Sequence, residues 1–231
     1  MVEILYDLGP CLVVNKPAGV LTQAPRGIES METLVKEFYR QREGIEPGAN
    51  MYLGLAHRID RPVTGALAFA RHVRAARKLC SQFANRTVSK VYWAFVEGHL
   101  APEEGTWTDY LHKRDGMAQA EVVGSDHPAA KHAVLHYRVQ WQSEIGSWLE
   151  IQLETGRTHQ IRIQSASRGH PVLGDAQYGS TSAFGRQHDD IRCRAIALHA
   201  RQLGFNHPMT GDPIDITAPL STDWDVLELP I

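Results

Sequence analysis

The chain has 231 residues, of which 43% are hydrophobic and 22% are charged, and its formal net charge is −2. This composition is typical of a soluble globular protein and argues against an intrinsically disordered chain. Apolar runs such as residues 65–70 are far shorter than the roughly 20 residues of a membrane span, and Glu3 and Asp7 stand where a signal peptide carries basic residues. We therefore expect one cytoplasmic domain over residues 1–231, without membrane contact and monomeric by default.

The cysteines and histidines form no recognised metal or disulfide pattern. Cys11, Cys80 and Cys193 are far apart and include no CxxC pair, which is unlike a disulfide framework or a zinc ribbon. The histidines between residues 127 and 136 lack the spacing of a metal-binding motif, and scattered surface or core histidines explain them better. No Gly-rich phosphate loop is present. These absences count against a metal site and a nucleotide cofactor.

Charge is unevenly distributed along the chain. Residues 57–96 contain eight basic residues against one acid, Asp60, whereas residues 208–231 contain five acids and no lysine or arginine. The near-neutral total can therefore hide a basic face that contacts phosphate. The alternative is that these charges only solvate one helix.

The first half of the chain combines strands and two helices. The apolar run 11–14 followed by Asn-Lys-Pro-Ala-Gly predicts a strand that enters a turn. Ser30 is suited to cap a helix that ends near Gly44, and residues 45–50 read as a loop. Residues 90–96 predict a further strand. Apolar residues at helical spacing predict a second helix, and the basic residues of this segment lie largely outside the apolar stripe. The apolar residues are Val73, Ala76, Leu79, Cys80 and Phe83.

The second half is rich in strand patterns. Alternating or apolar runs predict strands at 134–141, 148–153, 195–203 and 214–216, and the turn-rich link between the last two favours a hairpin. The glycine- and proline-containing segment 114–130 reads as a long, mobile surface segment. This order of elements favours an α+β fold over a doubly wound parallel sheet.

The segment 57–65, HRIDRPVTG, is the first candidate for chemistry. Asp60 lies between Arg58 and Arg61, and Pro62 and Gly65 shape a turn behind it. Nearby positive charge keeps a carboxylate ionised, which makes Asp60 available as a nucleophile or base. A buried structural ion pair beside a turn is the competing interpretation.

Two further segments have unusual composition. If Ile161 and Ile163 point into a core from a strand, Arg162 points away from it, and such an arginine is costly unless a fixed anion needs it. A strand with one solvated face is the alternative. The segment 168–179 contains three glycines and a proline, which indicates a specific loop or only a tight connection.

Six segments together resemble the RluA-type pseudouridine synthases. In the order of that family, from about residue 10 to 217, the chain contains VVNKPAGV (13–20), HRIDRPVTG (57–65), SKVYWAFVEG (89–98), LETGRTHQIR (153–162), GHPVLGDAQYG (169–179) and ALHARQLGFNHP (197–208). The resemblance implies a catalytic domain with a central, mostly antiparallel mixed sheet flanked by helices and loops. It also implies an enzyme that detaches uracil from ribose within RNA, rotates it and rejoins it through carbon 5, without metal or cofactor.

The resemblance assigns roles to individual residues. Asp60 corresponds to the essential aspartate, which acts as a nucleophile or a sugar-directed base, and Tyr92 is expected to stack on the uracil. Arg162 is expected to pair with Asp60, and Arg58 corresponds to the arginine that occupies the space left by the flipped nucleotide. The remaining residues expected to bind substrate are Arg61, His57, Arg157, His159, Gln160, Arg71, Arg74 and Lys78.

The chain departs from the family pattern at a few positions. Ile59 replaces a leucine, Val63-Thr64 replaces Thr-Ser, and Ile163-Gln164 replaces Val-His. The catalytic pattern starts by residue 11, without the S4-type RNA-binding domain of many relatives. We therefore expect a structured tRNA or rRNA to be recognised by the catalytic domain itself or through a partner.

Two other functions compete with this interpretation. One is an RNA-binding module or RNA chaperone that has kept the fold but lost turnover; the joint presence of Asp60, Tyr92 and Arg162 argues against it. The other is a hydrolase that uses Asp60 with His57 or His159, which no serine or cysteine nucleophile motif supports. The sequence does not identify the modified uridine.

Overall fold

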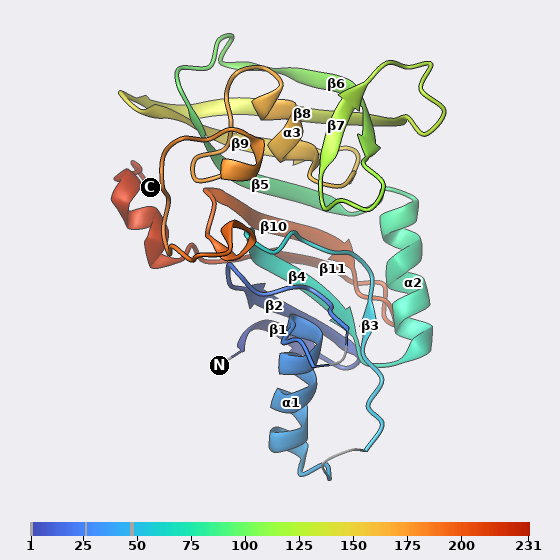
Figure 1. The fold of residues 1–231 in the computed structure, drawn as a ribbon. Helices are drawn as coiled ribbons and strands as arrows, with labels where there is room; N and C mark the ends of the chain where they lie inside the picture. The colour runs from blue at the N-terminus through green and yellow to red at the C-terminus, as the bar shows by residue number, and fades with distance from the viewer. Residues whose placement is uncertain (1, 26, 47–48) are drawn as a thin grey trace. The chain divides into compact units, whose positions relative to one another are not determined.

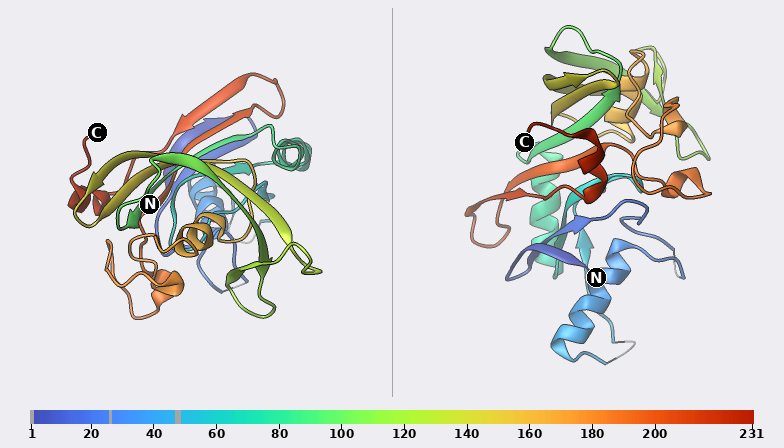
Figure 2. Two further views of the ribbon diagram at one scale, coloured as in Figure 1. Left: turned by 90° about the horizontal axis from the view of Figure 1, so that it is seen from above. Right: turned by 90° about the vertical axis from the view of Figure 1, so that its left-hand side faces the viewer.

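The computed structural model describes residues 2–25, 27–46 and 49–231. The chain forms two compact units, Met1–Ser89 with Ala200–Leu220 and Lys90–His199 with Ser221–Ile231. Each unit combines antiparallel strands with a small number of helices (Figures 1 and 2). The predicted α+β class is confirmed.

The first unit contains a twisted sheet with the order β1-β2-β4-β10, to which β3 adds on β4 and β11 on β10. The pairings β1–β2, β2–β4, β3–β4 and β10–β11 are antiparallel, and the last confirms the predicted hairpin. The strands are β1 Glu3–Leu8, β2 Cys11–Lys16, β3 Gly54–Leu55, β4 Thr64–Ala70, β10 Leu198–Asn206 and β11 Pro213–Thr217. β10 begins three residues later than predicted.

The first helix, α1 (Met31–Glu43), has the predicted bounds because both ends are specified locally. Ser30 caps it with a reciprocal capping box, and Gly44 ends it in the left-handed conformation. The buried side of α1 faces the sheet, where the Tyr39 hydroxyl donates a hydrogen bond to Asp7 at 2.8 Å. Residues 47–48 of the predicted loop lie outside the described residues.

The second helix, α2 (Val73–Ala84), packs against β3 and β4 and buries fewer of its large apolar residues than predicted. Ala75, Ala76 and Leu79 are buried, whereas Val73 and Cys80 are exposed. The two alanines allow a close approach to the strands. A Cβ on Gly54 would lie 2.6 Å from that of Ala76, so the packing selects the small residues over the larger apolar ones.

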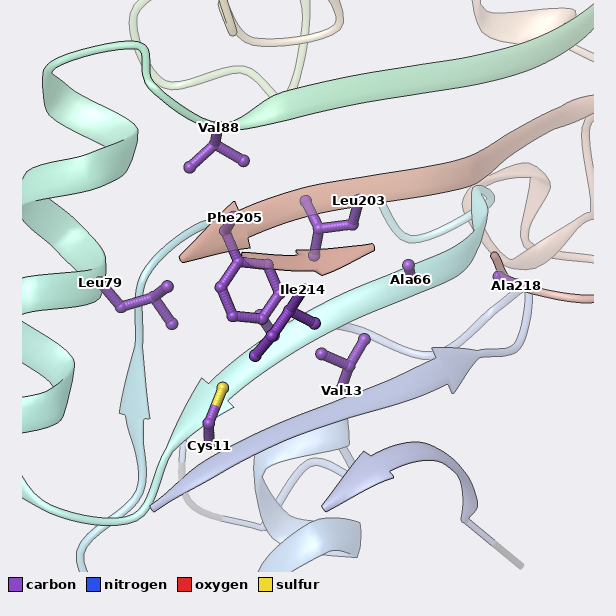
Figure 3. Close-up of a cluster of buried hydrophobic side chains, with 10 residues drawn as sticks. Cys11, Val13, Ala66, Leu79, Val88, Leu203, Phe205, Ile214 and Ala218 are labelled. Carbon is purple, nitrogen blue, oxygen red and sulfur yellow. The ribbon is translucent and has the colours of Figure 1, made fainter. Parts of the chain in front are cut away.

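One core cluster joins the sheet and α2 in this unit. Phe205 and Ile214 from the β10–β11 hairpin lie among side chains from β2, β4 and α2 (Figure 3). Burying such side chains contributes about 1.5–3 kcal/mol each. The buried members are Cys11, Val13, Ala66, Ala68, Leu79, Val88, Leu203, Phe205, Ile214 and Ala218.

The second unit contains a sheet in the order β5-β9-β8-β6-β7, antiparallel throughout. A short helix, α3 (Gln160–Ala166), packs against β6 and β7. Three 3₁₀ helices follow, at Ala176–Tyr178, Ile191–Cys193 and Thr222–Leu227. The strands are β5 Ser89–Glu97, β6 Glu104–Lys113, β7 Ala120–Val123, β8 Lys131–Ser143 and β9 Gly146–Leu153.

The segment 114–130, predicted as a long surface segment, contains a strand that the sequence did not indicate. β7 lies within it and pairs with Tyr110–Lys113 of β6, and Arg114 and Gln119 are joined by a backbone hydrogen bond at the turn. The glycine at 116 indicated a loop, but it serves a hairpin turn with a φ of 70°. Such a pairing depends on the partner strand, which local composition does not reveal.

Candidate active site

Asp60 lies in the loop between β3 and β4, where the backbone is tightly constrained. Its carbonyl oxygen accepts a hydrogen bond from Val63 N at 3.1 Å, which closes the turn that contains Pro62. Gly65, at the start of β4, has a φ of 114°, and a Cβ there would lie 2.4 Å from the carbonyl oxygen of Ala200. Only glycine fits this approach of two strands, and the Asp60 side chain is half-buried.

The turn that follows β2 clamps this loop from the other side. Lys16 Nζ donates to the carbonyl oxygens of Arg61 at 3.0 Å and Pro17 at 2.8 Å, while Gly19 and Arg61 exchange two hydrogen bonds of 2.8 Å. Lys16 is fully buried. Burial lowers the pKa of Lys16 to about 7, an effect that the charge of Asp60 opposes and that of Arg61 enhances.

His57 and Arg58 have different surroundings. His57 Nε2 accepts a hydrogen bond from Ala68 N at 3.0 Å, and its ring stacks on Phe83 with the centroids 4.5 Å apart. These contacts hold the loop against β4 and α2. Arg58 is exposed, and within the described ranges no hydrogen bond or ion pair engages its side chain. Its guanidinium is therefore accessible to a phosphate or a nucleobase.

The basic residues expected to bind RNA in and before α2 have different surroundings. Arg71 precedes α2, which His72 caps, and its guanidinium pairs with Glu43 at 2.5 Å and lies 4.0 Å from the ring centroid of Tyr39. Arg71 therefore makes structural contacts in this unit. The cations that are exposed on α2 and, in the described part of the chain, make no ion pair are Arg74, Arg77 and Lys78.

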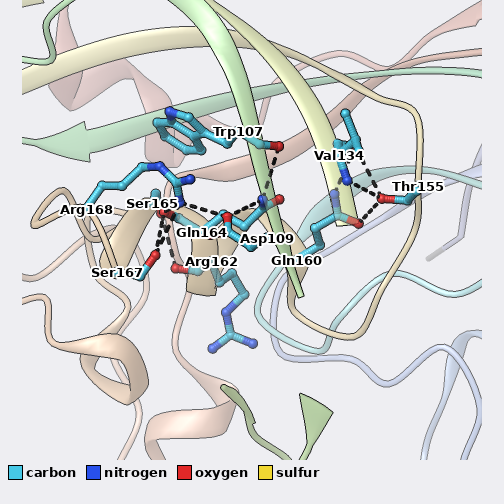
Figure 4. Close-up of polar contacts among 10 residues, drawn as sticks. All are labelled: Trp107, Asp109, Val134, Thr155, Gln160, Arg162, Gln164, Ser165, Ser167 and Arg168. Carbon is cyan, nitrogen blue, oxygen red and sulfur yellow. Dashed lines mark hydrogen bonds and ion pairs between the residues drawn. The ribbon is translucent and has the colours of Figure 1, made fainter. Parts of the chain in front are cut away.

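The segment after β9 is a turn followed by a helix, so the strand considered around Ile161 and Ile163 was wrong. Gln160 Oε1 accepts from Thr155 Oγ1 at 2.8 Å and Arg157 N at 3.0 Å, and its Nε2 donates to the carbonyl oxygen of Val134 at 3.1 Å (Figure 4). These buried bonds hold the turn that starts α3. The alternating isoleucines at 161 and 163 do not indicate these hydrogen bonds, because the partners are the β8 backbone and the Thr155 side chain.

Arg162 is buried on α3 and binds a carboxylate that the sequence analysis did not identify. Its Nε and one terminal nitrogen bind the two oxygens of Asp175 at 2.6 and 2.8 Å, and the same terminal nitrogen donates to Gln177 at 2.8 Å. The guanidinium carbon also lies 4.9 Å from the ring centroid of Tyr178. The glycine-rich pattern 168–179 was the available signal. The expected Arg162–Asp60 pair stays a prediction.

Tyr92 and His159 lie on different elements of the second unit. Tyr92 is half-buried on β5, opposite Ile151 of β9. His159 has a φ of 52° just before α3, and its Nδ1 lies 2.8 Å from the hydroxyl of Tyr178. That hydroxyl accepts a hydrogen bond from Ala120 N at 2.8 Å. His159 therefore has an uncommon backbone conformation, and its ring is positioned by the Tyr178 hydroxyl.

Gln164 is one of the departures from the family pattern, and it has a defined place in the unit. Its Nε2 donates to Asp109 Oδ2 at 2.6 Å and to the carbonyl oxygen of Trp107 at 3.3 Å, and Arg168 donates to the same Asp109 oxygen at 2.9 Å (Figure 4). Gln164 thus fastens α3 to β6.

The described residues contain neither a metal-binding cluster nor a helix suited to span a membrane. No group of three or more His, Cys, Asp or Glu side chains among residues 2–25, 27–46 and 49–231 is arranged to hold a metal ion. Over the same ranges, no helix has the length and apolar character needed to cross a membrane.

Comparison with known proteins identifies the family. A family model described as RNA pseudouridylate synthase matches residues 10–167, and the chain belongs to this family. The resemblance to RluA-type enzymes is thereby confirmed. The chain is an isomerase that converts uridine to pseudouridine in RNA.

Relatives and solved structures agree with this assignment. Ribosomal large subunit pseudouridine synthase D of Zymomonas mobilis is 34% identical over 97% of this chain and 71% of its own length. tRNA pseudouridine synthase C of Salmonella typhimurium is 31% identical over 97% of this chain and 87% of its own. The structure of human RNA pseudouridylate synthase domain containing 4 has a TM-score of 0.76 at 22% identity, covering 99% of this chain and 94% of that one, and shows the same fold.

Proposed function

We propose that this chain isomerises a specific uridine of a structured tRNA or rRNA, with Asp60 as the nucleophile or base. The relatives named for ribosomal and transfer RNA support these two substrate classes. In the reaction, the bond between N1 and the ribose breaks, the uracil turns, and carbon 5 joins the ribose. Carbon 5 loses a proton and N1 carries one at the end, so the reaction needs no co-reactant or cofactor.

The observation that carries the proposal is the constrained loop around Asp60. Hydrogen bonds from Lys16 and Gly19 meet at the carbonyl oxygen of Arg61, one residue from the carboxylate. A reacting group held by rigid backbone spends little free energy on orientation when substrate binds.

Other residues have supporting roles in the proposal. Tyr92 offers an aromatic face to the flipped uracil, and base stacking on such a face contributes about 1–3 kcal/mol. Arg162 is the proposed catalytic arginine, and its bidentate hydrogen bonds with Asp175 orient its guanidinium. Flipping a nucleotide out of duplex RNA costs a few kcal/mol, and Arg58 fills the space that the flipped nucleotide leaves.

The basic residues outside this set bind the RNA backbone in the proposal. Arg74 and Lys78 are exposed on α2, Arg61 lies in the loop that carries Asp60, and Arg157, His159 and Gln160 lie at the N-terminal end of α3, the helix that carries Arg162. We propose that residues 1–231 act as one catalytic domain, as a monomer in the cytoplasm. The match of the family model to residues 10–167, which draw on both units, supports a single functional domain.

Pseudouridine mapping of total cellular RNA tests the proposal. The comparison uses cells with the gene, without it, and with Asp60→Ala, and Asp225→Ala, an exposed acid on the last 3₁₀ helix, is the matched control. We expect one defined site to disappear without the gene and with Asp60→Ala, but not with Asp225→Ala. A purified protein that binds RNA yet modifies none would instead support an RNA-binding module.

A further inference from the structure

The second unit contains a cavity of about 150 Å³ that the proposed catalytic groups do not line. It lies between the ends of β6, β7 and β8 and the turn 156–158. Lys113 and Lys131 line it from the strands, and Arg157 and Thr158 line it from the turn. Strand pairing holds the two lysines in place, since Lys113 is opposite Ala120 and Lys131 is opposite Leu111.

The lining of this cavity is strongly basic. It contains three permanent cations and His112, but no aspartate or glutamate. The acid nearest along β7, Glu121, is already bound to Arg114 at 2.7 Å and to His112 at 3.3 Å. Within the described ranges, no ion pair neutralises Lys113, Lys131 or Arg157. Like charges brought together in this way repel one another unless an anion binds between them.

The Arg157 side chain is oriented by the protein. Its Nε donates to the carbonyl oxygen of His132 at 2.9 Å, and its backbone N–H donates to Gln160 at 3.0 Å. These two bonds hold the backbone and the Nε atom in place, and among the described residues no hydrogen bond engages the terminal nitrogens of the guanidinium. A planar guanidinium beside two ammonium groups and a threonine hydroxyl is a suitable donor set for phosphate oxygens.

The size of the cavity limits the ligand. Pockets for small molecules and cofactors measure about 300–1,000 Å³, so this cavity is too small for a nucleoside. It can admit a single phosphate group.

We infer that the cavity is a subsite for one backbone phosphate of the RNA substrate. This inference rests on the proposed function, because RNA is the polyanion that the enzyme handles. The turn 156–158 leads directly into α3, which carries Arg162. A phosphate bound there would anchor a nucleotide of the RNA strand to the unit that holds Arg162 and Tyr92.

The test combines RNA modification with salt dependence. We compare the wild-type protein with Lys113→Gln/Lys131→Gln, using a target RNA found by pseudouridine mapping. We expect the KM to rise about tenfold with kcat little changed, because the contact positions RNA without touching the reacting atoms. The slope of log affinity against log salt should fall by about one unit. Both lysines are exposed, so the thermal midpoint should stay close to the wild-type value.

The matched control is Lys36→Gln/Arg40→Gln on α1. It removes the same charge, but both cations already pair with glutamates of their own helix, so KM and salt slope should not change. If the cavity variant keeps the wild-type KM and salt slope, the subsite is wrong.

A second measurement separates this inference from the proposed function. Inorganic phosphate is titrated against the amide resonances of Gly156 and Thr158, at constant ionic strength with chloride. Saturable shifts that vanish in the Lys113→Gln/Lys131→Gln protein support the subsite even if no RNA is modified, in which case only the proposed function fails. If the resonances do not respond to phosphate, the subsite is overturned.

Discussion

The ammonium group of Lys16 donates a hydrogen bond to the backbone carbonyl oxygen of Arg61, the residue after Asp60, at 3.0 Å. Lys16 is fully buried, so this bond places a lysine that has lost its hydration beside the proposed catalytic carboxylate. The Lys-Pro-Ala-Gly turn and the HRIDR loop are thus held together as one rigid unit, although Lys16 and Arg61 are 45 positions apart in the chain. The stability and the titration of this element can be measured.

Stability should depend on pH through Lys16. Burial lowers the pKa of Lys16 from 10.5 to about 7 in the folded protein. Between these values the unfolded chain holds a proton that the folded chain has released, so the free energy of unfolding rises with pH, by up to about 1.4 kcal/mol per unit. Below about pH 7 Lys16 is protonated in both states, so the stability gained at higher pH is absent and the free energy of unfolding no longer changes with pH through this group.

The comparison that isolates this effect is with Lys16→Met, which lacks the titrating group. Urea unfolding at about pH 6, 8 and 9.5 should show the wild-type protein gaining stability relative to Lys16→Met as pH rises. A difference between the two proteins that is independent of pH would contradict the lowered pKa.

The Arg162–Asp175 pair should be sensitive to the loss of one charge. Asp175→Asn leaves the buried guanidinium without its carboxylate, and breaking a buried pair in this way costs about 3–5 kcal/mol. Activity should fall as well, since the guanidinium loses its orientation. Urea unfolding and a pseudouridine assay measure both effects. In the control Glu104→Gln, whose pair with Arg138 is largely exposed, stability should stay within about 0.5 kcal/mol.

Gly65 should tolerate no side chain. In Gly65→Ala the new Cβ meets the carbonyl oxygen of Ala200 at a φ of 114°, so we expect a loss of about 2–5 kcal/mol in the free energy of unfolding. Gly116→Ala is the control, because Gly116 also has a positive φ but no atom lies within 4 Å of the added Cβ. There the cost should be about 1 kcal/mol. Equal losses at both positions would refute the close approach.

Arg58→Ala should separate activity from stability. The side chain is exposed and makes no hydrogen bond or ion pair within the described ranges, so the free energy of unfolding should change by less than about 0.5 kcal/mol. If Arg58 replaces the flipped nucleotide, kcat/KM on a stacked uridine should fall about tenfold or more. Such a loss corresponds to part of the free energy needed to flip the nucleotide. On an RNA whose target uridine is already unstacked, the loss should be smaller. An equal loss on both RNAs would assign Arg58 to general RNA binding instead.

The sequence was most informative where structure depends on neighbours in the chain. The bounds of α1 follow from Ser30 and Gly44, which satisfy the helix ends by themselves. The β10–β11 hairpin follows from its turn residues. The family resemblance came from six motifs whose residues are specified by chemistry, and it predicted Asp60, Tyr92 and Arg162 as the catalytic residues without any knowledge of contacts.

Tertiary contacts decided the rest. β7 exists because β6 offers it a partner, and Arg162 lies on a helix because Gln160 satisfies the turn through Thr155 and the β8 backbone. The carboxylate that binds Arg162 within its unit is 13 residues away, at Asp175. No local pattern specifies such partners, because hydrogen bonds and charge pairs between distant segments depend on which segments the folded chain brings together. The sequence by itself thus determined the family and its chemistry, whereas only the folded structure decided which neighbours hold each group in place.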